Sequence, residues 1–115
     1  MRVAVVGSRS LKVNDLGAYL PDEVDKIISG GAKGVDRSAR DYALAHGIPL
    51  VEILPDYPQY GRLAPLLRNT AIVNRADLVL AFWDGESHGT RFVIDYCRSS
   101  RTPVQVYMRR KGQGG

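Results

Sequence analysis

The stretch that decides the fold is Ser29-Gly30-Gly31-Ala32-Lys33-Gly34-Val35-Asp36, which follows the apolar pair Ile27-Ile28 and precedes an apolar-periodic run. Its glycines free the backbone to turn sharply and to approach a ligand closely. A strand, a glycine-rich turn and a helix N-terminus in this order form an anion site, because free N–H groups and the positive end of the helix dipole face outward. The same pattern also fits a tight strand-to-helix turn without a ligand.

Strands and helices alternate along the chain on both sides of this stretch. Short apolar runs predict strands at residues 2–6, 26–29, 50–54, 78–82 and 104–107. A helix is predicted over residues 14–24 with Asn14 as N-cap, and a second one from Val35 to a stop at Gly47. Further helices are predicted from Pro65 onward and after Gly89. Residues 56–64 are predicted to form an irregular loop. The alternation predicts an α/β, Rossmann-like three-layer sandwich: a five-stranded parallel sheet with the first strand central and helices on both faces.

The composition is that of one globular domain. The 115 residues are 44% hydrophobic and 24% charged, and no linker or repeat divides them. We expect a single domain over residues 1–108 and a flexible basic, glycine-rich tail over 109–115. One cysteine, no signal-peptide pattern and no apolar run of membrane length favour a cytoplasmic protein that does not enter a membrane. The two histidines and the cysteine are too far apart for a zinc site, so no metal is expected.

The net charge of +4 is concentrated at the end of the chain. Without Arg109, Arg110 and Lys111, the 16 basic residues fall to 13 against 12 acidic ones, so residues 1–108 carry a net charge of only +1. A nearly balanced body gives no broad basic face, and general nucleic-acid binding is therefore not expected.

Three loops are predicted to meet where the parallel strands end, which is where such sheets bind ligands. They are Gly7–Arg9, Gly30–Asp36 and Asp84–Thr90. In the first loop, the Ser8 hydroxyl and the Arg9 guanidinium suit a phosphate or a carboxylate, although a solvated loop is an equally simple interpretation. Asp36 favours the dipole of its helix, and it also faces the ligand position, where it can accept a ribose hydroxyl.

Several motifs resemble the YspA-type branch of the SLOG superfamily. They are the Val-Gly-Ser-Arg start, the Ser29–Asp36 stretch, Tyr60-Gly-Arg-Leu-Ala64, Arg68-Asn69, and Asp77–Phe82 followed by Gly89-Thr90. The resemblance covers about residues 2–107. It implies a Rossmann-like domain, usually dimeric, that binds a nucleotide, with the glycine loop near the phosphates and Gly89-Thr90 closing the other side. The residues predicted to bind the ligand are Gly7, Ser8, Arg9, Gly30, Gly31, Ala32, Lys33, Gly34, Asp36, Arg68, Asn69, Gly89 and Thr90.

The same resemblance bears on catalysis. The LOG phosphoribohydrolases of this superfamily place a glutamate within one helical turn after the Gly-Thr, where it acts at the ribose carbon. Here Arg91, Phe92, Val93, Ile94 and Asp95 follow Gly89-Thr90, so that turn has no glutamate. Losing such a carboxylate costs orders of magnitude in rate. We therefore expect a domain that binds or senses a nucleotide without turning it over.

Two alternatives stay open. One is a nucleotide hydrolase or transferase with Asp36, Asp84 or Glu86 as its acid–base group. The other is a single-stranded-DNA module similar to DprA, which the balanced charge and the lack of a stacking row of aromatic residues disfavour. No cofactor is assigned, although the ligand class includes NAD and ADP-ribose.

Overall fold

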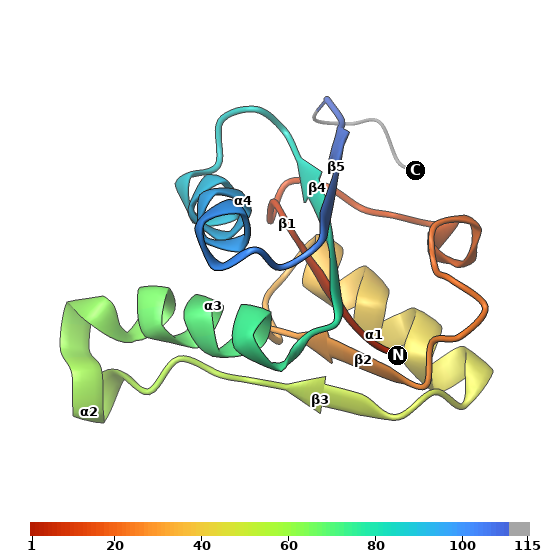
Figure 1. Ribbon diagram of the computed structural model, residues 1–115, viewed down its shortest axis with the longest axis horizontal. Helices are drawn as coiled ribbons and strands as arrows, with labels where there is room; N and C mark the ends of the chain where they lie inside the picture. Colours follow the sequence, from red (N-terminus) through yellow and green to blue (C-terminus); the bar gives the residue numbers. More distant parts are fainter. Residues whose placement is uncertain (111–115) are drawn as a thin grey trace.

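A five-stranded parallel sheet, in the order β3-β2-β1-β4-β5, forms the centre of the protein (Figure 1). The computed structural model describes residues 1–110. The strands are β1 (Arg2–Gly7), β2 (Lys26–Ser29), β3 (Leu50–Glu52), β4 (Leu78–Trp83) and β5 (Val104–Met108). β1 lies between β2 and β4, with Val3 paired to Ile27 on one side and to Leu78 on the other. The predicted α/β class, the parallel pairing and the central first strand are confirmed.

One strand is shorter than predicted. The sequence predicts a strand over residues 50–54, but β3 ends at Glu52. The reason is its neighbour: β2 ends at Ser29, which pairs with Glu52, so residues beyond Ile53 have no strand beside them. Ile53 still donates its backbone N–H to the Ser29 carbonyl at 2.9 Å, which marks the last contact along this edge.

Helices cover both faces of the sheet (Figure 1). They are α1 (Val35–His46), α2 (Tyr57–Tyr60), α3 (Ala64–Arg75) and α4 (His88–Ser100), with two short 3-10 turns, η1 (Leu16–Ala18) and η2 (Gly61–Leu63). Successive residues of β1 point to opposite faces, so Val3 and Val5 pack against α1 and residues 11–16, whereas Ala4 and Val6 pack against α3 and α4. Both cores consist mainly of apolar side chains, which explains why the inner strands read as apolar runs.

The predicted helix over residues 14–24 is wrong, because only the η1 turn forms there. Asn14 is not a cap; the residue before the turn is Asp15, and its side chain makes no capping hydrogen bond. Its internal backbone hydrogen bonds are those of short turns, such as Tyr19 N–H to the Leu16 carbonyl at 3.0 Å. Just before it, the Val13 N–H donates to the buried Ser38 hydroxyl of α1 at 2.9 Å. A Cβ at Gly17 would lie 2.7 Å from the Tyr42 hydroxyl, so the segment presses directly onto α1.

The predicted irregular loop over residues 56–64 is also wrong. This stretch holds α2 and η2, and α3 begins at Ala64. Asp56 caps α2 by accepting the Gln59 N–H at 3.2 Å, and Pro58 lies in the first turn, where its missing N–H does no harm. The proline-opened helix at Pro65 and the left-handed stop of α1 at Gly47 are confirmed.

The C-terminal end of the described chain is part of the folded body. The Arg109 backbone N–H donates to the Trp83 carbonyl at 2.8 Å, which continues the β4–β5 pairing by one residue. Its guanidinium lies 5.3 Å from the centre of the Tyr19 ring and 5.7 Å from that of Phe82, donates to the Tyr19 hydroxyl, and stands 3.9 Å from the Asp15 carboxylate. The tail expected over residues 109–115 therefore does not begin at Arg109, because Arg109 packs on the folded body. Residues 111–115 lie outside the described residues.

We expect Arg109→Ala to lower the free energy of unfolding by about 1–2 kcal/mol, because a largely desolvated cation over two aromatic rings and its packed stem are both lost. Urea unfolding followed by circular dichroism measures this. Arg37→Ala is the matched control, since Arg37 is 66% exposed and only pairs with Asp41 at 4.0 Å on its own helix; it should change stability by no more than about 0.5 kcal/mol. Equal effects of the two substitutions would show that the Arg109 cluster contributes nothing.

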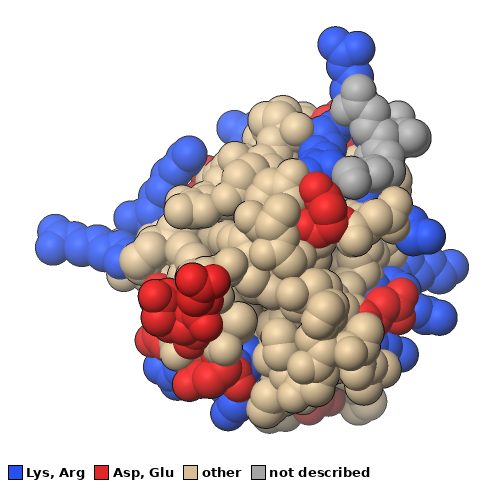
Figure 2. Space-filling model, turned by 90° about the vertical axis from the view of Figure 1, so that its right-hand side faces the viewer, with Lys and Arg blue, Asp and Glu red and all other residues tan. Residues whose placement is uncertain are grey.

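Acidic and basic side chains are mixed on the face of the molecule that carries residues 11–20. In Figure 2, Lys and Arg side chains lie mainly around the edge of this face, and Asp and Glu lie among them, so it has no continuous basic patch. Within residues 1–110, no helix has the length and apolarity to cross a bilayer, and no three His, Cys, Asp or Glu side chains gather as a metal site.

Candidate functional site

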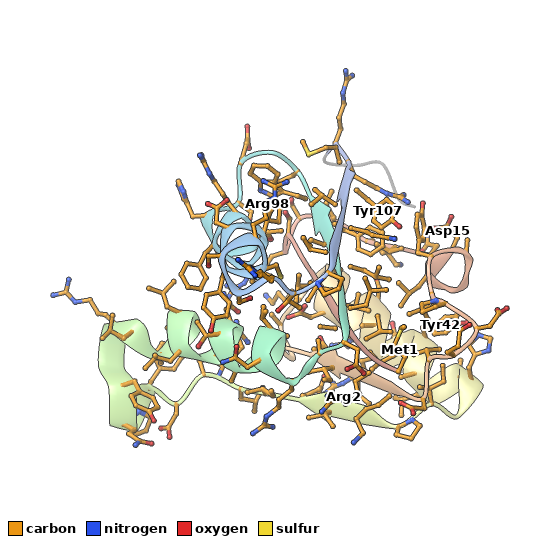
Figure 3. All side chains as sticks on the ribbon, in the orientation of Figure 1. Met1, Arg2, Asp15, Tyr42, Arg98 and Tyr107 are labelled. Atoms are coloured by element: carbon orange, nitrogen blue, oxygen red, sulfur yellow. The ribbon has the colours of Figure 1, made fainter. Side chains whose placement is uncertain are left out.

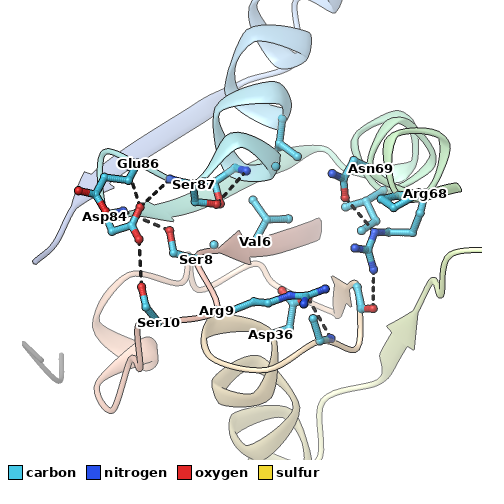
Figure 4. A pocket seen from close by; sticks show the side chains of 18 residues that line it. Val6, Ser8, Arg9, Ser10, Asp36, Arg68, Asn69, Asp84, Glu86 and Ser87 are labelled. Atoms are coloured by element: carbon cyan, nitrogen blue, oxygen red, sulfur yellow. Dashed lines mark hydrogen bonds between the residues drawn. The ribbon is translucent and has the colours of Figure 1, made fainter. Parts of the chain in front are cut away.

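A cavity of about 510 Å³ opens at the carboxyl ends of β1, β2 and β4 (Figure 4). This is the switch point of the sheet, because the chain leaves the central strand toward β2 on one side and β4 pairs on the other. Its walls come from the loops after these strands and from α3 and α4. The lining residues are Val6, Gly7, Ser8, Arg9, Ser10, Gly30, Ala32, Asp36, Pro65, Arg68, Asn69, Ile72, Asp84, Glu86, Ser87, Gly89, Thr90 and Val93.

Most residues predicted to bind the ligand line this cavity, although they come from four separate segments of the chain. The exceptions are Gly31, Lys33 and Gly34, which are absent from its walls. The three carboxylates considered for catalysis, Asp36, Asp84 and Glu86, all line it. The fold thus joins the three predicted loops with the start of α3.

The glycines of the Gly30–Asp36 loop serve packing. Gly31 and Gly34 have positive φ angles of 70° and 71°, which favour glycine. A Cβ at Gly34 would lie 2.4 Å from the Arg9 carbonyl oxygen, and one at Gly31 would lie 2.7 Å from a Leu54 methyl group. Both positions therefore face protein atoms, and the part of the loop that reaches the cavity is Gly30, Ala32 and Asp36.

Asp36 is the most deeply buried acidic residue of the site, with 7% of its surface exposed. It lies in the first turn of α1, and its Oδ2 accepts the Ala32 backbone N–H at 3.1 Å. Burial raises the pKa of this carboxyl, and the Ala32 hydrogen bond and the charge of Arg68 offset only part of that rise. A buried carboxyl with a raised pKa that faces a cavity is typical of functional positions.

Arg68 closes the β2–β3 side of the cavity. Its guanidinium donates to the Gly30 carbonyl at 2.7 Å and, through Nε, to the Asn69 side-chain oxygen at 2.9 Å. A Cβ at Gly30 would lie 2.5 Å from Arg68 Nη1 and 2.9 Å from Asp36 Oδ2, so the absence of a side chain there lets the two charged groups approach. Burial lowers the pKa of Arg68, Asp36 opposes this, and the charge of Arg9 lowers it further. Two guanidinium groups therefore share one cavity.

Asp84 organises the opposite side. Its Oδ1 accepts the backbone N–H groups of Glu86 at 2.9 Å and Ser87 at 2.8 Å, and its Oδ2 accepts the Ser10 hydroxyl at 3.0 Å. The Ser8 hydroxyl accepts the Asp84 N–H at 3.2 Å. These donors, led by the two backbone N–H groups, lower the pKa of Asp84 to about 2. Asp84 is thus a fixed carboxylate that joins the β1 and β4 loops, and it has no proton to donate near neutral pH.

The N-terminus of α4 presents backbone N–H groups beside the cavity. Ser87 caps the helix by accepting the Thr90 N–H at 3.5 Å. Within residues 1–110, the N–H groups of His88 and Gly89 have no protein acceptor, and they stand at the positive end of a 13-residue helix. A Cβ at Gly89 would meet only the Asn69 amide nitrogen, at 4.0 Å, so space is open beside this helix end.

Sequence reasoning missed two serines and the apolar wall. Ser87 had a readable signal, because a serine three residues before Thr90 is a typical N-cap pattern. Ser10 had none, since its contact with Asp84 depends on how the β1 and β4 loops pack. Val6, Ile72 and Val93 belong to the core that packs against α3 and α4, and they also form the apolar wall of the cavity.

The fold and the cavity together define a Rossmann-like α/β domain with a polar, two-arginine pocket at the carboxyl edge of its sheet. Comparisons of the chain with family models, with curated proteins and with solved structures gave no match.

Proposed function

We propose that the protein binds a nucleotide or a nucleotide derivative in this cavity. The observation that carries the proposal is that Arg9, Arg68 and Gly89, at the N-terminus of α4, all line one cavity at the switch point of a parallel sheet. These groups favour an anion, because a helix N-terminus and a guanidinium group each suit a phosphate.

The remaining walls suit the rest of such a ligand. Asp36 and Asn69 offer acceptor and donor atoms for ribose hydroxyls, while Val6, Ile72 and Val93 provide an apolar surface for a base or a sugar ring. In Figure 4, Arg68 and Asn69 lie at one end of the cavity, and Asp84 and Glu86 lie at the other. The basic and amide side chains are thus separated from these two carboxylates. The motif resemblance to the SLOG superfamily supports the same ligand class.

The site is built to bind rather than to cleave an N-glycosidic bond. In the turn after Gly89-Thr90, the position that faces the cavity is Val93, and Asp95 is turned outward, where it pairs with Arg91 at 3.9 Å. Asp84 is engaged by four donors or acceptors of the neighbouring loops. Ground-state binding does not need a carboxylate at the sugar carbon, whereas cleavage does.

A nucleotide hydrolase or transferase is the second candidate, and the buried Asp36 favours it. Incubating the protein with AMP, NAD and deoxynucleosides, and following free base by chromatography, separates the two functions. Binding alone predicts no release, whereas release at about 1 s⁻¹ or faster, lost in Asp36→Asn or Glu86→Gln, would establish an enzyme.

Binding itself is tested by a thermal-shift panel of AMP, ATP, NAD, ADP-ribose and cyclic dinucleotides. A ligand at 100 times its Kd should stabilise the protein by about 2.7 kcal/mol. No shift with any member, followed by flat calorimetric titrations, would reject the proposal.

Gly89→Leu locates the binding site. The leucine side chain fills the space beside the start of α4, so we expect at least about a hundredfold loss of affinity, which is about 2.8 kcal/mol. Because leucine is a better helix former than glycine, the stability of the free protein should be unchanged or slightly higher. Gly89→Ala is the graded control, since its Cβ reaches only van der Waals distance of Asn69. A folded Gly89→Leu variant with full affinity would place the ligand elsewhere.

A further inference from the structure

Asp36 is a buried carboxyl whose hydrogen-bonding capacity the protein fills only in part. It has 7% of its surface exposed, lines the cavity and accepts the Ala32 N–H at Oδ2, at 3.1 Å. Within residues 1–110, Oδ1 accepts no hydrogen bond. The fully buried Ser29 hydroxyl lies close enough to lower the pKa of Asp36, but it forms no hydrogen bond of ordinary geometry with these residues. Because a buried carboxylate oxygen without a donor is costly, a donor is expected from the ligand.

A guanidinium group stands beside this carboxyl without pairing with it. Arg68 Nη1 and Asp36 Oδ2 lie 2.5 and 2.9 Å from one point, the place where a Cβ on Gly30 would be. The two charges attract each other, but no hydrogen bond or ion pair joins the side chains. Arg68 uses Nε for the Asn69 side chain and Nη1 for two backbone carbonyls, so within residues 1–110 its Nη2 has no acceptor. In Figure 4, Asp36 and Arg68 lie on the side of the cavity away from Asp84.

A hydroxyl is the group that fits between an acceptor and a donor that are close but unpaired. It donates its proton to the carboxylate and accepts from the guanidinium, whereas a phosphate oxygen only accepts and a charged amino group only donates. The Asp36 carboxylate also has its second oxygen, Oδ1, which can accept from a neighbouring hydroxyl. Two hydroxyls on adjacent carbons therefore satisfy Asp36 and Arg68 together.

Asn69 connects this pair of side chains to the N-terminus of α4. Its side-chain oxygen accepts the Arg68 Nε–H at 2.9 Å, and its amide nitrogen faces the start of the helix, where a Cβ on Gly89 would lie 4.0 Å away. A single side chain thus spans the space from Arg68 to the helix N-terminus, which favours a phosphate. In a 5′-nucleotide the sugar is joined directly to the phosphate, and its 2′- and 3′-hydroxyls form the free edge of the ring. One ligand can therefore reach both places.

We propose that Asp36 and Arg68 together bind the 2′- and 3′-hydroxyls of a ribose, so that the protein selects ligands with a free ribose diol and discriminates against 2′-deoxynucleotides. This inference rests on the proposed nucleotide binding, which leaves the choice between ribose and deoxyribose open. It narrows the ligand class, because cyclic dinucleotides have one of these two oxygens esterified and DNA lacks the 2′-hydroxyl. AMP, ATP, NAD and ADP-ribose all carry the free diol.

Calorimetric titrations of the full chain with AMP, 2′-deoxy-AMP and 3′-deoxy-AMP test the diol contact. AMP should bind at least about tenfold more tightly than either analogue, because each analogue lacks a hydrogen bond to a charged group. In Asp36→Asn, the affinity for AMP should fall more than that for the analogues, so that the ratio approaches one.

Asp41→Asn is the matched control for Asp36→Asn. It makes the same exchange on the same helix, but Asp41 is 66% exposed and lies next to Tyr42, which Figure 3 labels on the second half of α1. The ratio of the affinities for AMP and the analogues should stay at its wild-type value. Thermal unfolding confirms that both variants fold.

Ribose 5-phosphate and 2-deoxyribose 5-phosphate repeat the comparison without a base, which keeps the diol contact separate from the fate of the proposed function. A preference for ribose 5-phosphate in a protein that binds no nucleotide would support the diol contact and reject nucleotide binding. Equal affinities for AMP and its two analogues would overturn the diol contact and leave nucleotide binding standing. A preference for AMP that persists unchanged in Asp36→Asn, or that Asp41→Asn also abolishes, would overturn the assignment to Asp36.

Discussion

Gly34→Ala should destabilise the protein by at least about 3 kcal/mol and leave little folded material at physiological temperature. The alanine Cβ would lie 2.4 Å from the Arg9 carbonyl oxygen and 2.6 Å from that of Ser8, both of them backbone atoms that cannot rotate away. The residue also has a φ of 71°, which adds about 1–2 kcal/mol for any L side chain. Relief would require separating the β1 loop from the start of α1, where the Val35 N–H bonds to the Ser8 carbonyl.

Gly47→Ala is the control for Gly34→Ala, because it separates the clash from the backbone strain. Gly47 has a φ of 65°, yet a Cβ there would meet no atom within 4 Å. We expect it to cost only about 1 kcal/mol. Urea unfolding of both variants measures the difference. If the two losses are equal, the close approach of the Ser8–Arg9 backbone to Gly34 is not what requires glycine at this position.

Asp36→Asn should raise the stability of the free protein at neutral pH and, at the same time, weaken ligand binding. In the folded state, the pKa of Asp36 lies above its usual value near 3.8, so the folded protein holds this proton more tightly than the unfolded chain does. The contribution of Asp36 to the free energy of unfolding therefore falls as the pH rises through its folded pKa. Above that pKa, the full loss of stability is present. Asparagine carries no charge, so it removes this loss of stability. Its side-chain oxygen can still accept the Ala32 N–H.

The gain from Asp36→Asn should appear as a melting temperature that exceeds the wild-type value at pH 7 and converges with it below pH 3.8. Asp41→Asn is the control, because Asp41 is 66% exposed on the same helix, and it should leave the melting temperature close to the wild-type value. Because a charged hydrogen bond to the ligand is lost, binding should weaken by about 1.5–3 kcal/mol. A variant that melts lower than wild type at pH 7 would mean that the Asp36–Arg68 attraction outweighs the cost of burial.

The strands could be predicted from the sequence because the inner strands have apolar surroundings on both faces of the sheet. Runs such as Val3–Val6 are buried on both faces, and burial on both faces leaves no alternative to a parallel sheet covered by helices. The 14–24 segment failed for the opposite reason. Its apolar residues have helical spacing, but Leu16 is inserted into the core formed with α1, and Tyr19, Leu20 and Val24 pack against that core. Tertiary packing overrides local propensity there.

The candidate site, too, could be predicted only in part. Its location followed from topology, because the loops after parallel strands must meet at one edge. The roles of single residues did not follow. Three glycines in the Ser29–Asp36 stretch look alike in the sequence, yet Gly30 makes room for Arg68 and Asp36, while Gly34 makes room for the Arg9 carbonyl. Likewise, Asp84 read as a candidate acid, and only the donors around it show a fixed carboxylate.

The central place of β1 also sets an order of assembly. Its pairing with β2 joins residues 24 apart, Val3 and Ile27, whereas its pairing with β4 joins Val3 to Leu78, 75 residues away. Closing the longer loop costs about 1 kcal/mol more in chain entropy, so we expect the β1–β2 half to form first and the β4–α4 half to dock onto it. Asp36 belongs to the early half and Thr90 to the late one, so the cavity is complete only when the last of the sheet is in place. We therefore expect any molecule that binds in this cavity to stabilise the docking of the two halves.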